Sequence, residues 1–295
     1  MTTALVTDPD DDAPVTPRPF LKWAGGKGQL LRQFQPLLPA SYGRYFEPFM
    51  GGAALFFCLQ PKRATLTDVN AELIDCYRAV RDRVDEVIAA LGRHAYEEAH
   101  YYKVRDVDPA SLTLPERAAR TIFLNKTGFN GLYRVNSAGR FNVPFGRYVK
   151  PAICNPPQLR ACSAALQGVE LEVRDFERVL DHAQEGDFVY LDPPYSPVSS
   201  TANFTSYSAR GFGFRDQERL AALFAELDGR GVQVMLSNSD VPEIPPLYKR
   251  FKIDRVAALR SINAKSDARG RVGEIVIRNY GARRSRKAAP ADKAG

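Results

Sequence analysis

The stretch DFVYLDPPY, residues 187–195, decides the fold of this chain. Its first half is an apolar run typical of a buried strand, and two prolines follow almost directly. Because proline has no backbone N–H to donate to a sheet, the chain must leave the sheet at Pro193. We therefore predict that Asp192 and Tyr195 are held together at the carboxyl end of a central strand.

Further apolar runs have the pattern of buried strands. They are RYFEPF, ATLTD, VELEV, VQVMLS and GEIVIRN, and several of them end in a polar or acidic residue. The segment from Arg215 to Leu227 has apolar residues at the spacing of an amphipathic helix. Alternating strands and helices predict an α/β fold with a mostly parallel sheet. In such sheets ligands bind at the carboxyl ends of the strands.

The middle of the chain departs from this pattern. Residues 71 to about 124 are almost wholly helical in pattern, and NKTGFNGLYRVNSAGRFNVPFG then mixes glycine, asparagine and aromatic residues, as an irregular β-hairpin does. We therefore expect a helix-rich inserted domain over residues 71–152, within an α/β domain formed by 19–70 and 153–281. A flexible arm (1–18) and a basic flexible tail (282–295) are expected at the ends.

Composition restricts the class of protein. The 41 lysines and arginines exceed the 34 acidic residues, so the formal net charge is +7, which permits a polyanionic partner. The cysteines form no CxxC pair and the histidines share no metal-ligand spacing, so we expect no metal. No apolar stretch reaches the roughly 20 residues that span a bilayer, and the N-terminus lacks the features of a signal peptide. We expect a soluble cytoplasmic protein.

The DPPY tetrad has the chemistry to bind a planar base. Asp192 and the carbonyl of Pro193 can accept the two hydrogens of an exocyclic amine, while Tyr195 stacks on the ring. Taken alone, the tetrad is equally compatible with an ordinary turn from a strand into a loop.

Other motifs favour the binding interpretation. The stretch FEPFMGGAA follows a predicted strand and opens a helix, which lets a ligand approach the backbone closely. Asp68 ends the next strand, where a carboxylate binds ribose hydroxyls in dinucleotide folds. FLKWAGGK places the only tryptophan of the chain among glycines and lysines.

Four separated blocks carry a family resemblance: FLKWAGGK, EPFMGGAALFF, NKTGFNGLYRVNSAGRFNVPFG and DPPYSPVSSTANFTSY. In these blocks and their order, the chain from about Phe20 to Tyr280 resembles the Dam-type DNA adenine-N6 methyltransferases, the alpha class with a DPPY motif. The resemblance implies a Rossmann-like sheet with an inserted target-recognition domain. It also implies transfer of a methyl group from S-adenosylmethionine to the N6 amine of an adenine flipped out of duplex DNA, in the sequence GATC.

The resemblance also assigns the cofactor pocket. The residues implied to bind S-adenosylmethionine are Trp23, Lys27, Glu47, Phe49, Gly51, Asp68, Asp175, Phe176 and Asp192, with Asp175 and Phe176 placed against the cofactor adenine. Asp192, Pro193 and Tyr195 would be the catalytic residues. Ala53 stands where many relatives have a third glycine, and we expect only a small effect, because alanine is tolerated wherever φ is negative.

Sequence reading is expected from residues 128–148 and from Lys22. The resemblance implies that Phe129 fills the stack left by the flipped base and that Asn130 contacts the orphaned partner base. Other side chains have the chemistry to read base edges: Arg134 and Lys22 toward guanines, and Leu132 and Pro144 toward a thymine methyl. A purely structural hairpin with an exposed arginine is the alternative.

Two other functions remain open. One is a catalytically silent DNA-binding relative, against which the intact DPPY tetrad argues. The other is a methyltransferase for RNA adenine, cytosine N4 or a protein glutamine, since these chemistries use similar loops; the hairpin block favours duplex DNA. The expected partners are double-stranded DNA and a possible cognate restriction endonuclease, without a membrane or a metal, and the chain is expected to be a monomer.

Overall fold

The computed structural model of the chain describes residues 15–23, 25–194, 212–259 and 271–281. Tyr195 and the rest of the block that follows the DPP tripeptide therefore lie outside the described residues. Within these ranges, no helix combines the length and the apolar character needed to span a bilayer.

A seven-stranded sheet runs through the molecule in the order β3-β2-β1-β4-β5-β7-β6. The strands are β1 Tyr45–Glu47, β2 Ala64–Asp68, β3 Glu170–Val173, β4 Phe188–Leu191, β5 Gln233–Ser239, β6 Lys252–Leu259 and β7 Arg271–Arg278. The first five of these in the sheet are parallel, and β7 is antiparallel to both β5 and β6. The predicted α/β fold with a mostly parallel, Rossmann-like sheet is confirmed.

The helices alternate with these strands and also fill the middle of the chain. The α-helices are α1 Leu31–Phe34, α2 Ala54–Leu59, α3 Ala71–Asp82, α4 Val84–Leu91, α5 Glu98–Asp106, α6 Leu114–Thr127, α7 Pro156–Leu166 and α8 Phe214–Gly229. The 3-10 helices are η1 Lys27–Gln29, η2 Gln35–Leu37, η3 Pro109–Ser111, η4 Phe129–Gly131, η5 Phe176–Asp181 and η6 Pro245–Tyr248. Side-chain caps explain why α3 and α7 begin where they do, since Asn70 and Asn155 each accept an N–H bond of the first turn.

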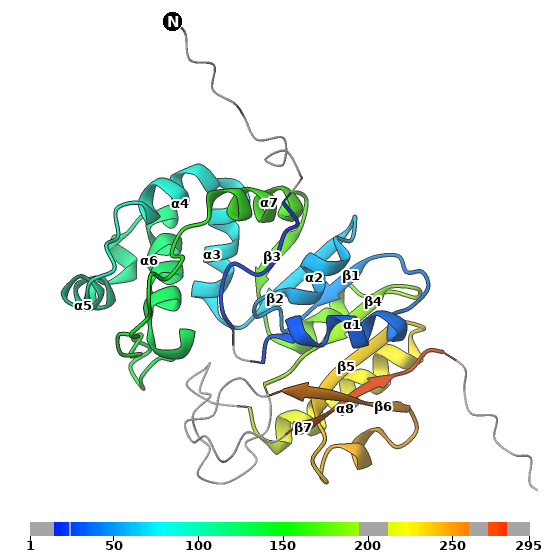
Figure 1. Ribbon diagram of the computed structural model, residues 1–295. Coiled ribbons are helices and arrows are strands. Elements are labelled where there is room, and N and C mark those ends of the chain that lie inside the picture. The colour runs from blue at the N-terminus through cyan, green and yellow to red at the C-terminus, as the bar shows by residue number, and fades with distance from the viewer. Residues whose placement is uncertain (1–14, 24, 195–211, 260–270, 282–295) are drawn as a thin grey trace, which may run out of the picture.

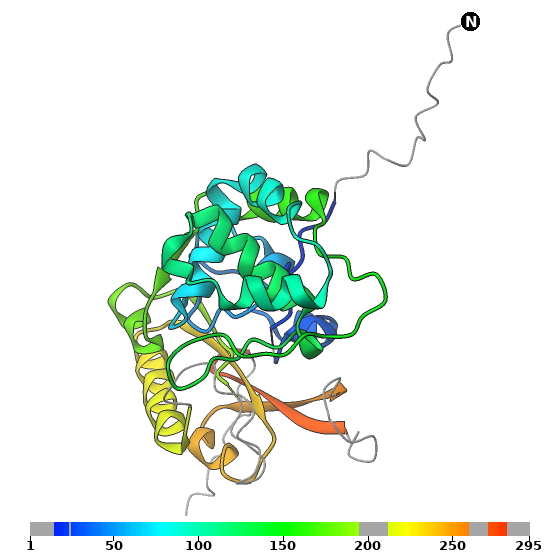
Figure 2. The ribbon, with the colours of Figure 1, turned by 90° about the vertical axis from the view of Figure 1, so that its left-hand side faces the viewer.

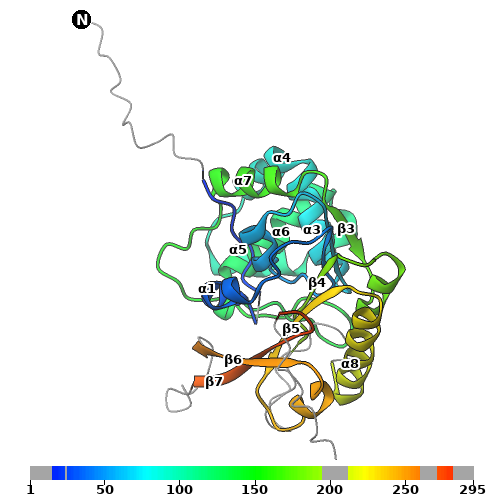
Figure 3. The ribbon, with the colours of Figure 1, turned by 90° about the vertical axis from the view of Figure 1, so that its right-hand side faces the viewer.

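Two apolar cores lie on the two faces of the sheet. One joins Tyr45 and Leu66 of the strands to residues of α3, α4 and α6, so the helical section shares a core with the sheet. The other joins Phe46 and Val189 to α8. Figure 1 shows α3 to α7 gathered at one end of the molecule, and in Figure 3 the strands pass between α1 and α8.

Helix α3 also protects the edge of the sheet. Arg78 donates to the carbonyl of Leu171 at 2.7 Å, and Arg81 donates to the carbonyl of Val169 at 2.7 Å. An edge strand with bonded carbonyls is a poor template for pairing with another chain. The helical section is thus anchored to the first strand of the sheet by hydrogen bonds as well as by the shared core.

The segment predicted as a hairpin folds back on itself with little regular pairing. Its strands meet only at isolated bridges in the described structure, between Gly128 and Phe145 and between Val135 and Phe141. Asn136 closes the tip by accepting the backbone N–H groups of residues 138 and 140. In Figure 2 this green segment runs along the lower side of the helical layer. The irregular hairpin was predicted correctly, and its distortion begins at η4, where Asn130 has a φ of 56°.

The expectation about Ala53 was wrong in its premise. This residue has φ 51° and ψ 39°, which is the left-handed region, and it directly precedes α2. A left-handed conformation costs a non-glycine residue about 1 to 2 kcal/mol. The turn is nevertheless held, because the N–H of Ala53 donates to the carbonyl of Met50 at 2.6 Å and its methyl group is buried.

Candidate active site

Three acidic residues lie at the carboxyl-terminal end of the sheet, where β1, β2 and β4 finish. Glu47 ends β1, Asp68 ends β2, and Asp192 follows β4. The chain order of the strands reverses between β1 and β4, which pair in parallel. Such a reversal point is where ligands enter open α/β sheets. The fold thus places these carboxyl groups at the position where sheets of this type bind ligands.

Asp192 is held through one oxygen. Its Oδ1 lies 2.6 Å from Nζ of Lys27 and accepts a hydrogen bond from Oγ of Ser237 at 2.9 Å. The Ser237 hydroxyl in turn lies 3.0 Å from the hydroxyl of Tyr190. Burial raises the pKa of Asp192, whereas Lys27 and Ser237 act in the opposite direction. The two contacts therefore favour the ionised carboxylate in an enclosed place.

Lys27 is the first residue of η1, and its side chain extends to Asp192. Its side chain is 4% exposed, and its ammonium group donates to the carbonyl of Gly25 at 2.7 Å and lies 3.8 Å from Glu274 of β7. A buried ammonium group needs such partners to offset its lost hydration. The predicted site residues Lys27 and Asp192 are therefore in direct contact.

Glu47 lies at the same end of the sheet, but its carboxyl group has a different protonation state from that of Asp192. The hydroxyl of Tyr45 donates to its Oε2 at 2.7 Å, and the carboxyl is almost wholly buried. Burial, with the nearby charge of Asp192, raises the pKa of Glu47 to about 8. At neutral pH Glu47 is therefore mostly protonated.

Asp68 is oriented by backbone N–H groups. Its Oδ2 accepts from the N–H of Gly51 at 3.2 Å, and its Oδ1 accepts from that of Asn70 at 2.9 Å. Burial raises the pKa of Asp68 to about 6, while these bonds work against that rise. The carboxylate joins the glycine turn after β1 to the end of β2.

Gly51 makes room for Trp23. Its φ is +44°, and a Cβ atom at this position would lie 2.8 Å from Cδ1 of the indole. On its other side Trp23 stacks on Tyr133, with ring centroids 5.0 Å apart and an angle of 29°. The only tryptophan of the chain thus lies between the glycine turn and the segment predicted to read the target.

The predicted pair Asp175 and Phe176 lies beside Phe49. The rings of Phe49 and Phe176 stack at 5.1 Å and 24°. The carboxylate of Asp175 accepts from the N–H of Glu177 and contacts Arg219 at 3.3 Å, so it caps η5. The structure therefore brings the rings of Phe49 and Phe176 together near the carboxyl-terminal end of the sheet.

The residues predicted to contact DNA lie along one segment and its neighbour loop. Phe129 is 48% exposed, and Asn130 and Pro144 are exposed as well, whereas Leu132 is half-buried. The guanidinium of Arg134 donates to Oδ1 and to the carbonyl of Asn142, at 2.8 and 3.2 Å. Lys22 is exposed, and its ammonium group lies 5.1 Å from the ring of Tyr148.

Sequence reasoning missed the polar residues behind the site. Ser237 and Tyr190 are fully buried, as is Asn125, which bonds the backbone of Lys22. The only available signal for Ser237 was its place at the end of an apolar run, a feature shared by several other strands. Asn125 carried no separate signal within its helix.

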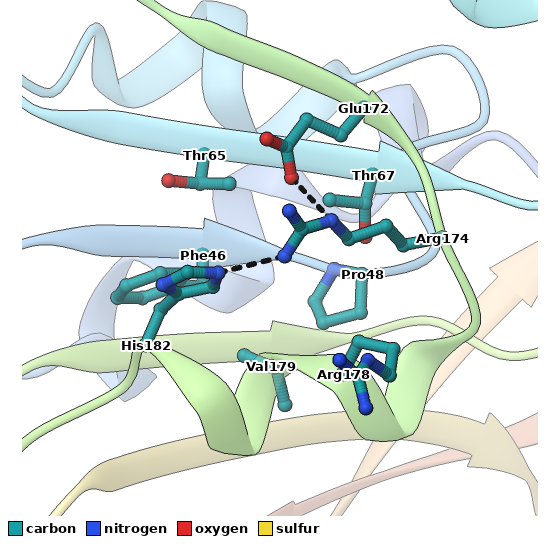
Figure 4. A pocket seen from close by; sticks show the side chains of 9 residues that line it. All are labelled: Phe46, Pro48, Thr65, Thr67, Glu172, Arg174, Arg178, Val179 and His182. Carbon is teal, nitrogen blue, oxygen red and sulfur yellow. Dashed lines mark hydrogen bonds and ion pairs between the residues drawn. The ribbon is translucent and has the colours of Figure 1, made fainter.

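A separate hollow lies between η5 and the neighbouring ends of β1, β2 and β3 (Figure 4). It is lined by Phe46, Pro48, Thr65, Thr67, Glu172, Arg174, Arg178, Val179 and His182. Within it, Arg174 contacts Glu172 at 2.6 Å and His182 at 2.7 Å. None of the predicted site residues line this hollow. Over the described ranges, no group of three or more His, Cys, Asp or Glu side chains is arranged to hold a metal ion.

Comparisons with known proteins agree with this geometry. The model of the D12 class of N6 adenine-specific DNA methyltransferases matches residues 23–262. A type II methyltransferase of Lactococcus lactis subsp. cremoris is 46% identical over 272 residues, which cover 90% of this chain and 96% of that protein. A type II methyltransferase of Methanocaldococcus jannaschii is 42% identical, covering 89% and 99%. The DNA adenine methylase of Escherichia coli K12 is 35% identical, covering 88% and 94%. The chain therefore belongs to the D12 class of N6 adenine-specific DNA methyltransferases.

Proposed function

We propose that this chain transfers the methyl group of S-adenosylmethionine to the N6 amine of an adenine flipped out of duplex DNA, with GATC as the recognition sequence. The observation that carries the proposal is the arrangement of Asp192, enclosed at the reversal point of the sheet and fixed by Lys27 and Ser237. A catalytically silent relative would gain nothing from this charge pair, because removing two charged groups from water costs free energy.

The residues at the carboxyl-terminal end of the sheet fit the methyl donor. When bound, S-adenosylmethionine supplies an electrophilic methyl group on a sulfonium centre. Asp68 would bind the ribose hydroxyls, and Phe176 with Phe49 would lie against the adenine. Gly51 supports the fit, since its lack of a side chain lets Trp23 and a ligand approach the turn.

Asp192 and Pro193 would activate the target amine. The lone pair of that amine is delocalised into the adenine ring, so the nitrogen is a weak nucleophile. Hydrogen bonds from the amine to the Asp192 carboxylate and to the Pro193 carbonyl favour a more tetrahedral nitrogen. Among the described residues, Lys27 and Ser237 both contact Oδ1 of Asp192, so we assign Oδ2 to the amine. Alignment of the amine against the methyl group then supplies much of the rate.

Two exposed residues at the start of the recognition segment (residues 128–148) would replace the flipped base. Removing an adenine from the duplex costs a few kcal/mol. Phe129, which is 48% exposed, would fill the gap in the stack, and the adjacent Asn130 would contact the orphaned base. Its exposure leaves the ring of Phe129 accessible to a partner, as this role requires.

Arg134 would read a guanine. Asn142 accepts two hydrogen bonds from its guanidinium group, which fixes the direction of the remaining N–H donors. A fixed fork suits the O6 and N7 acceptors of guanine in the major groove. Lys22 would donate to a second guanine, and Leu132 and Pro144 would contact a thymine methyl. We propose residues 71–152 as the target-recognition domain on this basis.

The names of the relatives support a cellular context. Two of the similar proteins are type II methyltransferases, a name used for the modification half of restriction-modification systems. We propose a restriction endonuclease of the same specificity as the partner of this chain, and a monomer as its active form.

The proposal is tested by methylation of DNA in cells that lack adenine methylation. Expression of the chain should make GATC sites resistant to an endonuclease that N6-methyladenine blocks, and the Asp192→Ala variant should give no protection. Unchanged cutting would refute GATC, and mapping of modified bases would then show the true site. If the purified Asp192→Ala variant transferred labelled methyl groups at the wild-type rate, the mechanism would be wrong.

A further inference from the structure

The side chain of Asn125 joins two parts of the protein that are distant in sequence. Its Oδ1 accepts from the N–H of Lys22 at 2.7 Å, and its Nδ2 donates to the carbonyl of Lys22 at 2.8 Å and to that of Gly131 at 3.0 Å. The residue is 1% exposed. One buried amide is therefore bonded both to the loop at Lys22 and to the start of the recognition segment at Gly131.

Close packing reinforces this connection. Gly131 has a φ of +64°, and a Cβ atom there would lie 2.4 Å from Cδ of Lys22. The stem of Lys22 therefore lies directly across the backbone of Gly131. The loop at Lys22 and the backbone at Gly131 are therefore packed directly against each other.

The next residue along the loop, Trp23, continues the connection. Its indole stacks on Tyr133, whose hydroxyl donates to Glu72, and Glu72 forms an ion pair with Arg120 at 3.0 Å. The other edge of the indole lies on Gly51, in the turn that borders Asp68. Trp23 thus touches both the proposed donor pocket and the recognition segment.

We propose that Asn125 and Tyr133 are positioning residues that couple recognition of the DNA site to binding of the methyl donor. This inference rests on the proposed function, in which Lys22 reads a base and Trp23 contacts the donor. Since these two residues are adjacent, a movement of the Lys22 backbone on the DNA would also move the indole of Trp23, and Asn125 joins that backbone to Gly131. By linkage, the same coupling factor must govern both binding equilibria.

The coupling is measurable because Trp23 is the only tryptophan in the chain. Its fluorescence would be followed while S-adenosylhomocysteine is added, with and without a saturating duplex that carries the mapped methylation site. We expect the duplex to tighten binding of this probe by about fivefold or more in the wild type. The Tyr133→Leu variant, which loses the stack, should bring the ratio of the two Kd values to within about twofold of one.

Tyr133→Phe is the matched control. It keeps the ring and loses only the hydroxyl that bonds Glu72, so it should keep most of the coupling. Asn125→Ala should reduce the coupling by releasing Lys22, and the Tyr133 variants decide the question if that buried substitution prevents folding. Activity alone would not separate positioning from damage, whereas the ratio of Kd values does.

Three results would overturn this inference. A wild-type ratio within about twofold of one would show that the two sites are independent. A Tyr133→Leu ratio equal to that of the wild type would show that the stack transmits nothing. Failure of the folded wild type to bind S-adenosylhomocysteine would refute the proposed function itself, and this inference with it, so the two failures are distinguishable.

Discussion

Replacement of Ser237 by alanine should move the acid limb of the pH–rate profile toward higher pH. Ser237 donates to Oδ1 of Asp192 at 2.9 Å, and this bond favours the ionised form of the carboxyl. In the proposed mechanism, Asp192 accepts the amine of the target adenine as an ionised carboxylate. Without the serine hydroxyl, burial is opposed by Lys27 alone, so the pKa of Asp192 rises further and the rate falls at a higher pH.

The size of the shift follows from the strength of the lost bond. A hydrogen bond to a charged group contributes about 1.5 to 3 kcal/mol. One pKa unit corresponds to about 1.4 kcal/mol. We therefore expect the acid limb of the Ser237→Ala variant to lie about 1 to 2 pH units above that of the wild type.

The assay is the single-turnover rate of methyl transfer to duplex DNA over a range of pH. Single turnover is needed because product release limits the steady-state rate of many enzymes. Ser163→Ala is the matched control, because Ser163 is also buried and makes one hydrogen bond of 3.0 Å, to the neutral carbonyl of Arg81. This control should lose about 1 kcal/mol of stability and keep the wild-type profile.

An unchanged acid limb in a folded Ser237→Ala protein would refute the reasoning. It would mean either that Asp192 does not titrate in the transfer step or that Lys27 alone fixes its charge. A limb shifted equally in the Ser163→Ala control would show that general loss of packing causes the effect. Tyr190→Phe should give a smaller shift of the same sign, because its hydroxyl contacts Ser237 and not the carboxylate.

Three further outcomes are expected. Arg134→Ala should cost about 1 to 3 kcal/mol of discrimination at one base pair, measured as the ratio of methylation rates on matched duplexes, and equal loss on all duplexes would contradict its role in reading. Phe129→Ala should slow transfer to a paired adenine, whereas a mismatch at the target should restore much of the rate; a mismatch without effect would count against the wedge. Glu47 has a pKa raised from 4.5 to about 8, so the folded state keeps a proton that the unfolded state loses, and the stability this residue contributes declines as pH rises from about 4.5 to about 8. Glu47→Gln should flatten this decline in denaturant midpoints taken at several pH values, and parallel curves for both proteins would show that Glu47 does not cause it.

The strands that form the buried part of the sheet could be predicted from the sequence because both of their faces are apolar. β4 is a continuous apolar run that is buried along its whole length, and β5 contains the buried apolar run Val234 to Leu236 before its polar end. β6 was not predicted, because it lies at the edge and places Lys252, Asp254 and Arg255 among its apolar residues. The other edge strand, β3, was predicted because its apolar and acidic residues alternate regularly.

The contacts within the site could be predicted only in part. Asp192 and Asp68 could be predicted from the sequence, since each lies at the carboxyl end of a buried strand. The ion pair between Lys27 and Asp192 joins residues far apart in the chain, and no local pattern encodes it. The conformation of Ala53 was misjudged for a related reason, because the tertiary contacts of the turn outweigh the local preference of alanine.

Glu47, Asp68 and Asp192, at the carboxyl-terminal end of the sheet, are stabilised in three different ways. These differences determine the net charge of the site. Glu47 keeps its proton, Asp68 rests on two backbone N–H groups, and Asp192 is paired with Lys27. The site is therefore far less negative than its residue types indicate. The pocket proposed for the donor would select its ligand by shape and hydrogen bonds, and salt would affect it little. Lys22 is exposed instead, so under the proposed function we expect binding of DNA, and not binding of the donor, to weaken strongly with salt.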